Sequence, residues 1–584
     1  MSSVDREQQI AQAEEILGDR REQPGFVKGL MFGEYFADRL PAYPSVARDE
    51  SLTARVQELQ KFCTESIDPV AIDKKAEIPQ SVISGLGRLG VLGACLPKSV
   101  GGLDLSQAAY CRLLEVLGGH CAGTALFVNA HHSIGPRAIV LFGTAAQQQQ
   151  YLPKLASGEW ISAFALTEPE AGSDAANVQS TATPTPDGKG FQINGQKRWI
   201  TNGGIAQVLT LMARTPASGG GESKITAFLV TPDMPGFQVV EKRMEKMGVR
   251  GTATSRLAFN NMFVPRQNVL GQMGKGLKVA LTVLDFGRTT FGAVCTGAAK
   301  FCLARAIEHS KSRVQFGEPL ASFELVKEKL AYMQAGVFAM EACTYETAAL
   351  IDAGEGDFML ETAMLKVFST ETLWKILNDT FQLHGGLAYF TDRPFERMVR
   401  DHRINTIGEG ANDVLRAFVA LVGMRDVGLE LQGVRDAIYQ PLGNLTRLGS
   451  FAGRKLGSLL VAPAVPVRNG ELEPDAAELG KLIRLLGSNV QRLLIQHQMS
   501  IVDRQYLLSR VADAATELYV SACVLRRLDA MLRDHHDHAA LRLDLESGRY
   551  YLLTARRRIR QALSSLWDND DAQSTALANR LLRS

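Results

Sequence analysis

The pattern of hydrophobic and polar positions changes twice along the chain, from helical spacing to strand-like runs and back. From about residue 50 to 160, apolar residues recur at helical spacing between Gly and Pro punctuation. Between about 160 and 270 the apolar runs are short and β-branched or aromatic, as in Phe164–Thr167, Val208–Met212, Ile225–Val230 and Phe237–Val240. These runs predict a β domain, and no alternation of strands with helices appears in it.

Helical spacing returns from about residue 273. One apolar set there is Phe291, Cys295, Ala298, Cys302 and Ala306, and another is Val326, Leu330, Met333, Val337 and Met340. Each set lines one helix face, which predicts an antiparallel helical bundle. Beyond a linker rich in Pro and Gly at 462–470, the spacing of Leu508, Val511, Ala515, Leu518 and Ala522 predicts further helices.

The expected fold is therefore α+β and mainly α. It has an N-terminal helical domain, a middle β-barrel-like domain, a C-terminal four-helix bundle and an extra C-terminal helical domain. The expected boundaries are an extension at 1–50, the helical domain at 51–160, the β domain at 161–272 and the bundle at 273–430. A linker with a helix follows at 431–470, and the additional helical domain occupies 471–584.

Composition narrows the class of protein. The chain has 584 residues, 46% of them hydrophobic, and a formal net charge of +2, which gives no global reason to expect a nucleic-acid partner. Its eight cysteines form no CxxC pair, which favours reduced thiols over a disulfide frame or zinc site. No signal or transit peptide and no bilayer-spanning run is visible, so we expect a cytoplasmic protein.

One carboxylate stands out near the two-thirds point of the chain. Glu409 lies between Gly408 and Gly410, and Asn412-Asp413 after it reads as the start of a helix. Glycines remove the bulk that would keep a ligand from the backbone, and a helix N-terminus favours an ionised carboxylate. Glu409 is thus a candidate general base, with a solvent-exposed loop residue as the alternative.

Three other patterns are weaker. Gly85-Leu86-Gly87-Arg88-Leu89-Gly90 matches the dinucleotide fingerprint, but the segment before it looks helical rather than strand-like. His131-His132 lacks companion ligands at metal spacing and is read as a packing or capping pair. Asp534-His535-His536-Asp537-His538 is read as a polar turn between helices.

Two basic segments lie in the C-terminal part. Residues 442–461 carry three basic residues and no acid among leucines, which is typical of a helix on an anionic membrane surface. A helix packed on protein, or a basic loop, fits the same pattern. Arg556-Arg557-Arg558-Ile559-Arg560 is read as a solvated helix face rather than a nucleic-acid site.

Five motifs resemble those of the acyl-CoA dehydrogenase family, in the same order and spacing, over about residues 50–425. They are Ala165-Leu166-Thr167-Glu168-Pro169-Glu170-Ala171-Gly172-Ser173-Asp174, Lys197-Arg198-Trp199-Ile200-Thr201-Asn202-Gly203, Arg313-Val314-Gln315-Phe316-Gly317, Gln382-Leu383-His384-Gly385-Gly386 and Gly408-Glu409-Gly410. The length and the C-terminal extension are similar to those of the very-long-chain branch, which is membrane-associated through the region that matches 442–461.

The resemblance implies a flavoenzyme that holds FAD between the β domain and the bundle. It implies oxidation of a long-chain acyl-CoA to a trans-2-enoyl-CoA, with electrons passed to an electron-transfer flavoprotein. A carboxylate takes the α-proton while a hydride leaves the β-carbon for the flavin. The chain is expected to work as a homodimer, in contact with an inner membrane face if the basic helix binds lipid.

The resemblance also assigns roles to single residues. Glu409 matches the catalytic base; the position that carries the base in some relatives is Gly287 here, beside Arg288, which supports the substrate site. Ser173, Gly408 and Gly410 match substrate-site positions. The positions that match the FAD site are Phe164, Leu166, Thr167, Gly172, Ser173, Trp199, Thr201, Arg313, Gln315, Phe316, Gln382, Gly385, Gly386, Ala411 and Asp413, of which 313, 315 and 316 reach the FAD of the neighbouring subunit.

Two positions depart from the family pattern. Gly408 stands where an aromatic residue usually precedes the base, and Ala411 stands where a Thr usually follows it. The first change removes a wall of the acyl pocket, and the second removes a hydroxyl that would bond the cofactor phosphate. A flavin oxidase or monooxygenase on the same fold, and a non-catalytic assembly protein that kept the fold, are the alternative functions.

Overall fold

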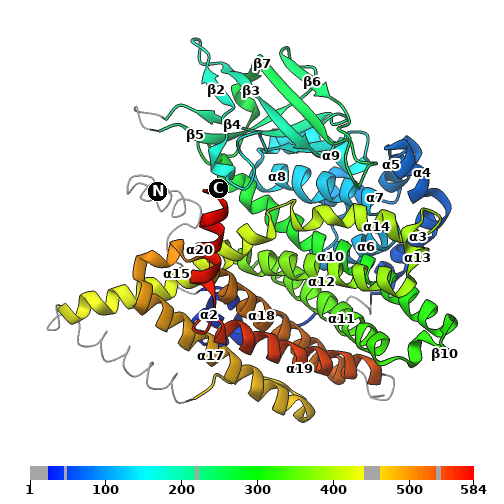
Figure 1. Ribbon diagram of the computed structural model, residues 1–584. Coiled ribbons are helices and arrows are strands. Elements are labelled where there is room, and N and C mark those ends of the chain that lie inside the picture. The colour runs from blue at the N-terminus through cyan, green and yellow to red at the C-terminus, as the bar shows by residue number, and fades with distance from the viewer. Residues whose placement is uncertain (1–23, 45–48, 218–221, 440–460, 535–540, 584) are drawn as a thin grey trace. The chain divides into compact units, whose positions relative to one another are not determined.

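The computed structural model describes residues 24–44, 49–217, 222–439, 461–534 and 541–583 (Figure 1). The chain forms two compact units. Unit 1 comprises the described residues within 45–330 and 369–411, and unit 2 those within 20–44, 331–368 and 412–584. The basic segment predicted at 442–461 and the His-rich segment at 535–538 fall outside the described residues, apart from Val461.

Unit 1 begins with helices, as the spacing of apolar residues predicts. They are α3 (Glu50–Ser66), α4 (Pro69–Lys75), α5 (Gln80–Arg88), α6 (Gln107–His120), α7 (Ala122–Val128), α8 (Gly135–Phe142) and α9 (Ala145–Ser157). A π-helical turn, Asn129–Ile134, joins α7 to α8. Such turns are rare inside helices and often accompany functional sites.

Two of the fingerprint-like glycines, Gly85 and Gly87, lie in α5 and serve helix packing, and Gly90 follows the helix. A Cβ at Gly85 would lie 2.2 Å from the Phe62 ring, and one at Gly87 would lie 2.2 Å from the Ser157 carbonyl oxygen. Because the described residues before α5 form no strand and the glycines face protein, the segment is not a dinucleotide loop, as predicted.

An eight-stranded sheet follows in unit 1, labelled at the top of Figure 1. Its strands are β1 (Ser162–Ala165), β2 (Thr181–Pro184), β3 (Gly190–Ile200), β4 (Val208–Thr215), β5 (Lys224–Val230), β6 (Phe237–Glu241), β7 (Ser255–Pro265) and β8 (Val269–Leu270). The hydrogen-bonded order is β6-β7-β3-β2-β4-β5-β8, and β1 pairs in parallel with β4. The four predicted runs lie at β1, β4, β5 and β6.

One core lies on each side of this sheet. On one side, Met212, Leu229 and Leu270 pack with α8 and α9 and the start of α10 (Gly276–Ser312). On the other side Phe191 and Phe228 meet edge to face, with ring centroids 5.2 Å apart. The sheet is thereby held rigid, and the segments that leave its strands start from fixed points.

The long helices that follow confirm the predicted periodicity. They are α10, α11 (Glu324–Asp352) and α12 (Met359–His384), followed by the short α13 (Gly386–Tyr389) and α14 (Phe395–His402) and by α15 (Asn412–Tyr439). Every member of the predicted face of α10 is buried. In α11, Met333, Val337 and Met340 are buried, whereas Val326 and Leu330 are only partly so.

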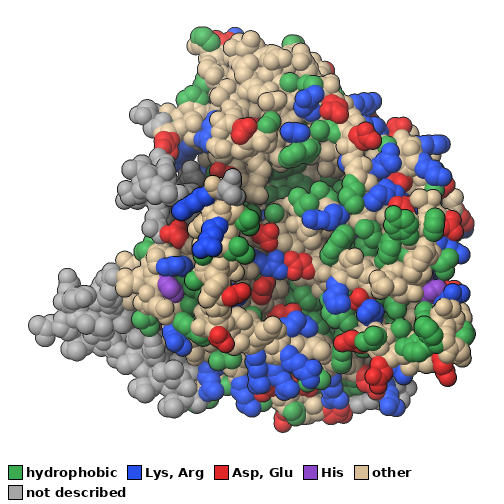
Figure 2. Space-filling model, in the orientation of Figure 1, with side chains coloured by type: hydrophobic (Ala, Val, Ile, Leu, Met, Phe, Trp, Pro, Cys, Tyr) green, Lys and Arg blue, Asp and Glu red, His purple; other side chains and the backbone are tan. Residues whose placement is uncertain are grey.

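Unit 2 contains α2 (Phe26–Phe32), α17 (Glu473–His497), α18 (Gln505–Asp534), α19 (Arg542–Ser564) and α20 (Asp571–Leu581). All five predicted positions of α18 are buried. Within the basic run of α19, Ile559 is fully buried and Arg560 pairs with Glu478 at 2.7 Å. Figure 2 shows Lys and Arg side chains interspersed with Asp and Glu over α17 and α19. None of the described helices is long and apolar enough to cross a membrane.

The neighbouring histidines of the π-helical turn are packing residues, as predicted. His131 accepts from the Ser162 amide at 3.1 Å, and His132 accepts from the Cys95 amide at 3.0 Å. Each ring donates its other nitrogen proton to a backbone carbonyl, so both are neutral. Burial lowers the pKa of His131 to about 4 and that of His132 well below its usual value.

We expect His131 and His132 to lower the free energy of unfolding as the pH is lowered from about 6.5 to 5. Histidines in the unfolded chain take up protons in this range, while the buried rings do not. The stability that the two buried rings contribute is therefore complete above pH 6.5 and is lost on acidification, at about 1.4 kcal/mol per pH unit for each ring. Urea titrations at several pH values measure the slope. His132→Gln should reduce this slope by the amount that corresponds to the uptake of about one proton. An unchanged slope would contradict the conclusion that His132 is buried as a neutral ring.

Candidate active site

The glycine-flanked carboxylate lies on a left-handed turn of unit 1. Glu409 has φ +56° and Gly410 has φ +98°, between α14 with the 3-10 turn that follows it and the first residue of α15. A non-glycine residue in this region costs free energy and is enriched at functional sites. The predicted helix does begin at Asn412, three residues after the carboxylate.

Three residues from two other elements surround Glu409. Its Oε1 accepts a hydrogen bond of 3.0 Å from Asn129 Nδ2, and its backbone oxygen accepts from Arg288 Nε at 3.4 Å. A Cβ at Gly287 would lie 3.0 Å from Glu409 Oε2, so a side chain here would crowd the carboxylate. Arg288 is buried and paired with Asp285 at 2.9 Å. The predicted neighbours 287, 288 and 409 therefore come together.

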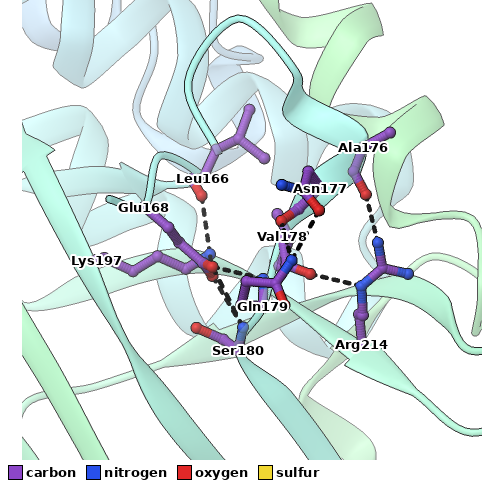
Figure 3. Close-up of polar contacts among 9 residues, drawn as sticks. All are labelled: Leu166, Glu168, Ala176, Asn177, Val178, Gln179, Ser180, Lys197 and Arg214. Carbon is purple, nitrogen blue, oxygen red and sulfur yellow. Dashed lines mark hydrogen bonds and ion pairs between the residues drawn. The ribbon is translucent and has the colours of Figure 1, made fainter. Parts of the chain in front are cut away.

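The loop after β1 is anchored by a buried ion pair (Figure 3). Lys197 of β3 donates to Glu168 Oε1 at 2.6 Å and to the Leu166 carbonyl at 2.8 Å. Glu168 also accepts from the backbone amides of Gln179 at 2.5 Å and Ser180 at 3.1 Å. The pair thus ties the two ends of the loop to the sheet.

Burial and the partner charge act in opposite directions on each member of this pair. Burial lowers the pKa of Lys197 to about 8, although Glu168 acts in the opposite direction. Burial also acts to raise the pKa of Glu168, but Lys197 and the backbone donors outweigh it and the pKa lies below its ordinary value. Both groups are charged at neutral pH, since they satisfy each other's hydrogen bonds.

A second cation braces the same loop from β4. Arg214 donates to the carbonyl oxygens of Val178 and Ala176, both at 2.5 Å (Figure 3). With both ends fixed, Gly172 and Ser173 lie exposed on the loop, and a Cβ at Gly172 would meet no atom within 4 Å. The loop therefore presents open backbone at a fixed place.

The end of β3 presents an exposed aromatic ring beside this loop. Trp199 has φ +59° and its side chain is 54% exposed, with the Arg198 guanidinium 4.6 Å from the ring centroid. The Arg198 amide donates to the Thr167 carbonyl at 3.0 Å, which joins the loop to this strand end. Thr201, in the turn after β3, and Phe164, in β1, are partly buried.

These features fit the flavin that the resemblance implies. A large indole held in a strained backbone conformation and left half exposed provides a face for a planar ring system. Gly172 leaves room for close approach of a ligand to the backbone, and the hydroxyls of Thr167, Ser173 and Thr201 offer hydrogen bonds.

The other predicted cofactor residues lie at the ends of α10 and α12. Arg313 and Gln315 are exposed, and Phe316, with φ +55°, is 96% exposed at the tip of the hairpin formed by β9 (Val314–Gln315) and β10 (Glu318–Pro319). Gln382 is exposed at the end of α12, and Cβ atoms at Gly385 and Gly386 would meet nothing within 4 Å.

A ring contact brings these two ends together. His309 of α10 stacks on His384 of α12, with ring centroids 4.3 Å apart. Of the last two predicted positions, Ala411 is partly buried in unit 1 and Asp413 is exposed in unit 2.

Asn129 is a contact of Glu409 that was not predicted from the sequence, because an Asn inside an apolar helical run carries no signal for a partner 280 residues away.

Comparison with known proteins accounts for nearly the whole chain. Family models for the acyl-CoA dehydrogenase N-terminal, middle and C-terminal domains match residues 49–159, 163–262 and 274–423. The model "ACAD9/ACADV, C-terminal domain" matches residues 470–581. The mitochondrial very long-chain specific acyl-CoA dehydrogenase of Homo sapiens is 37% identical, over 94% of this chain and 85% of that protein.

Two further relatives agree. A probable acyl-CoA dehydrogenase of Mycobacterium tuberculosis is 33% identical over 100% of this chain and 92% of its own length. The crystal structure of an acyl-CoA dehydrogenase from Bacillus anthracis, complexed with FAD, superposes with a TM-score of 0.79 at 25% identity, covering 95% of this chain and 94% of that one. The chain belongs to the acyl-CoA dehydrogenase family.

Proposed function

We propose that this protein oxidises long-chain acyl-CoA thioesters to trans-2-enoyl-CoA with FAD as its cofactor. The observation that carries the proposal is the Glu409 carboxylate, on a left-handed turn between two glycines and held by Asn129. The family membership and the FAD complex of the Bacillus anthracis relative support the cofactor. The names of the curated relatives support the long acyl chain.

Glu409 acts as the base that takes the α-proton of the thioester. Arg288 binds the backbone oxygen of Glu409 and fixes the turn, and Gly287 leaves the space that the carboxylate occupies. Burial of the acyl chain excludes water from the carboxylate and strengthens it as a base. FAD, when bound, supplies the acceptor for the hydride that leaves the β-carbon.

The loop after β1 and the end of β3 hold the flavin ring. Trp199 provides a face for the flavin ring. Thr167, Ser173 and Thr201 form hydrogen bonds with the polar edge of the ring, and Gly172 leaves room for the ring to approach the backbone. Phe164 and Leu166 are packed against the core beside α8 and α9, so they fix the start of the loop. Ser173 also faces the thioester.

A homodimer completes the cofactor site in this proposal. Arg313, Gln315 and the exposed Phe316 of one subunit reach the FAD of its partner, near Gln382, Gly385 and Gly386. Ala411 and Asp413, which follow the base in the sequence, are assigned to the cofactor site by the family resemblance alone. Electrons pass to an electron-transfer flavoprotein, and the segment 442–461 contacts a membrane.

The proposed division of labour follows the expected domains. In it, FAD lies between the β domain at 161–272 and the helical bundle at 273–430, residues 51–160 form the N-terminal helical domain, and residues 471–584 form the additional helical domain.

Anaerobic titration with acyl-CoA thioesters of increasing chain length tests the function. We expect a yellow protein whose flavin absorbance bleaches, with long chains acting at lower concentrations than short ones. Slow recovery of colour in air identifies a dehydrogenase, whereas fast recovery identifies an oxidase. A colourless protein, or a flavin that no thioester bleaches, would contradict the proposal.

A further inference from the structure

The π-helical turn between α7 and α8 places a buried amide against the carboxylate of Glu409. Asn129, the first residue of the turn, is fully buried, and its Nδ2 lies 3.0 Å from Glu409 Oε1. The two residues belong to the same compact unit. Because a π turn carries one extra residue, it directs a side chain away from the ordinary helical face.

The other end of the amide is held as firmly. Asn129 Oδ1 accepts a short hydrogen bond from the hydroxyl of Thr290 on α10, and Thr290 Oγ1 lies 3.0 Å from Ser133 Oγ. Thr290 and Ser133 are buried. A carboxylate only accepts hydrogen bonds, so the NH₂ of Asn129 must face Glu409 and its oxygen must face Thr290. The amide cannot rotate without losing one of these bonds.

The turn itself gives Glu409 little side-chain support. Its flanking residues are Gly408 and Gly410, and even a Cβ at Gly408 would lie 3.7 Å or more from its neighbours. The charged groups beside it are Arg288, which binds its backbone oxygen, and Asp285, which pairs with Arg288. The buried amide on the facing element therefore holds the Oε1 end of the carboxylate.

We propose that Asn129, held by Thr290, is a positioning residue that aims the Glu409 carboxylate and keeps it ionised. The inference rests on the proposed function of Glu409 as the base. A hydrogen bond from an N–H group to the ionised carboxylate stabilises that form relative to the protonated acid, and it holds the Glu409 side chain in one rotamer. Its effect falls on proton removal rather than on thioester binding.

The test compares Asn129→Ala and Thr290→Val with the wild-type holoenzyme. We expect Asn129→Ala to lower the rate constant of anaerobic flavin bleaching by about tenfold or more. The thioester concentration that gives half the maximal rate should change little. The acid limb of the pH profile should move to higher pH, because the ionised base has lost a donor. Thr290→Val should lower the rate constant of bleaching and move the acid limb to higher pH, each by a smaller amount than Asn129→Ala.

Thr347→Val is the matched control, since Thr347 is a fully buried threonine of α11 whose hydroxyl bonds the Cys343 carbonyl in unit 2. It should leave rate and pH profile unchanged. FAD content and the midpoint of thermal unfolding, measured for each variant, separate a folding defect from lost positioning. A wild-type rate and pH profile in Asn129→Ala and Thr290→Val would overturn the inference and leave the proposed function intact. Failure of the wild-type protein to bleach would overturn the proposed function itself.

Discussion

Glu409→Gln should slow bleaching of the flavin by acyl-CoA at least about a hundredfold while leaving the yellow holoenzyme intact. The amide has the shape of the carboxylate but cannot take a proton, and loss of a general base costs about 10²–10⁴ in rate. Asn129 Nδ2 would still find an oxygen at position 409, so the turn keeps its contact. Rapid mixing under anaerobic conditions, followed by flavin absorbance, measures the rate constant of reduction.

The control for this substitution is Glu58→Gln, which makes the same change at an exposed glutamate of α3. It should bleach at the wild-type rate. Binding of acyl-CoA to Glu409→Gln, measured by calorimetry, should remain within a few-fold of wild type, because the residue acts on the transition state. If Glu409→Gln reduced its flavin as fast as Glu58→Gln, another group would be the base.

Lys197→Met should destabilise the protein and weaken FAD binding. The substitution leaves the Glu168 carboxylate buried without its cation and leaves the Leu166 carbonyl without its donor. Removal of one partner of a buried pair costs about 3–5 kcal/mol. The loop that carries Gly172 and Ser173 then loses one of its anchors to β3. Urea unfolding gives the stability, and FAD released on dilution gives the cofactor affinity.

Lys189→Met is the matched control for this prediction. Lys189, just before β3, is exposed and lies 3.7 Å from the exposed Asp187, so its loss should change stability by less than about 0.5 kcal/mol. Glu168→Gln keeps an oxygen that can accept from the backbone amides of Gln179 and Ser180 but removes the negative charge, so its urea midpoint and FAD retention should lie between those of the Lys197 and Lys189 variants. Equal urea midpoints and equal FAD retention for the Lys197 and Lys189 variants would show that the buried pair does not hold the loop.

Helix faces and the candidate base were visible in the sequence because their signals are local. The face of α10 from Phe291 to Ala306 repeats every three or four residues, and that spacing alone predicts burial. Glu409 stood out because glycines on both sides are an unusual setting for a buried helix or strand. Its neighbours Gly287 and Arg288 came from the family resemblance.

The strands β2, β3 and β7 were not predicted as strands. In β3 a glycine and a buried charged residue, Gly195 and Lys197, interrupt the alternation of polar and apolar residues that marks a half-buried strand. Lys197 reads as a surface residue in the sequence, since a lysine is fully buried only when a partner is supplied from elsewhere. That partner, Glu168, comes from another segment, and its approach is set by the fold.

Asn129 escaped prediction for the same reason. Its two partners, Thr290 and Glu409, lie 161 and 280 residues away, and the π turn that directs it follows from packing rather than from local propensity. Long-range polar contacts of this kind are fixed by the tertiary structure, so a single sequence gives no spacing from which to read them.

A deuterium isotope effect tests most directly whether Glu409 removes the α-proton. Acyl-CoA deuterated at the α-carbon and its unlabelled counterpart are mixed anaerobically with the wild-type holoenzyme and with Glu409→Gln, and the rate of flavin bleaching is recorded. We predict that deuteration slows the wild-type protein several-fold and that the Gln variant bleaches at least about a hundredfold more slowly than wild type with either substrate. Equal rates with both substrates in the wild type, together with bleaching of the variant at the wild-type rate, would contradict the account.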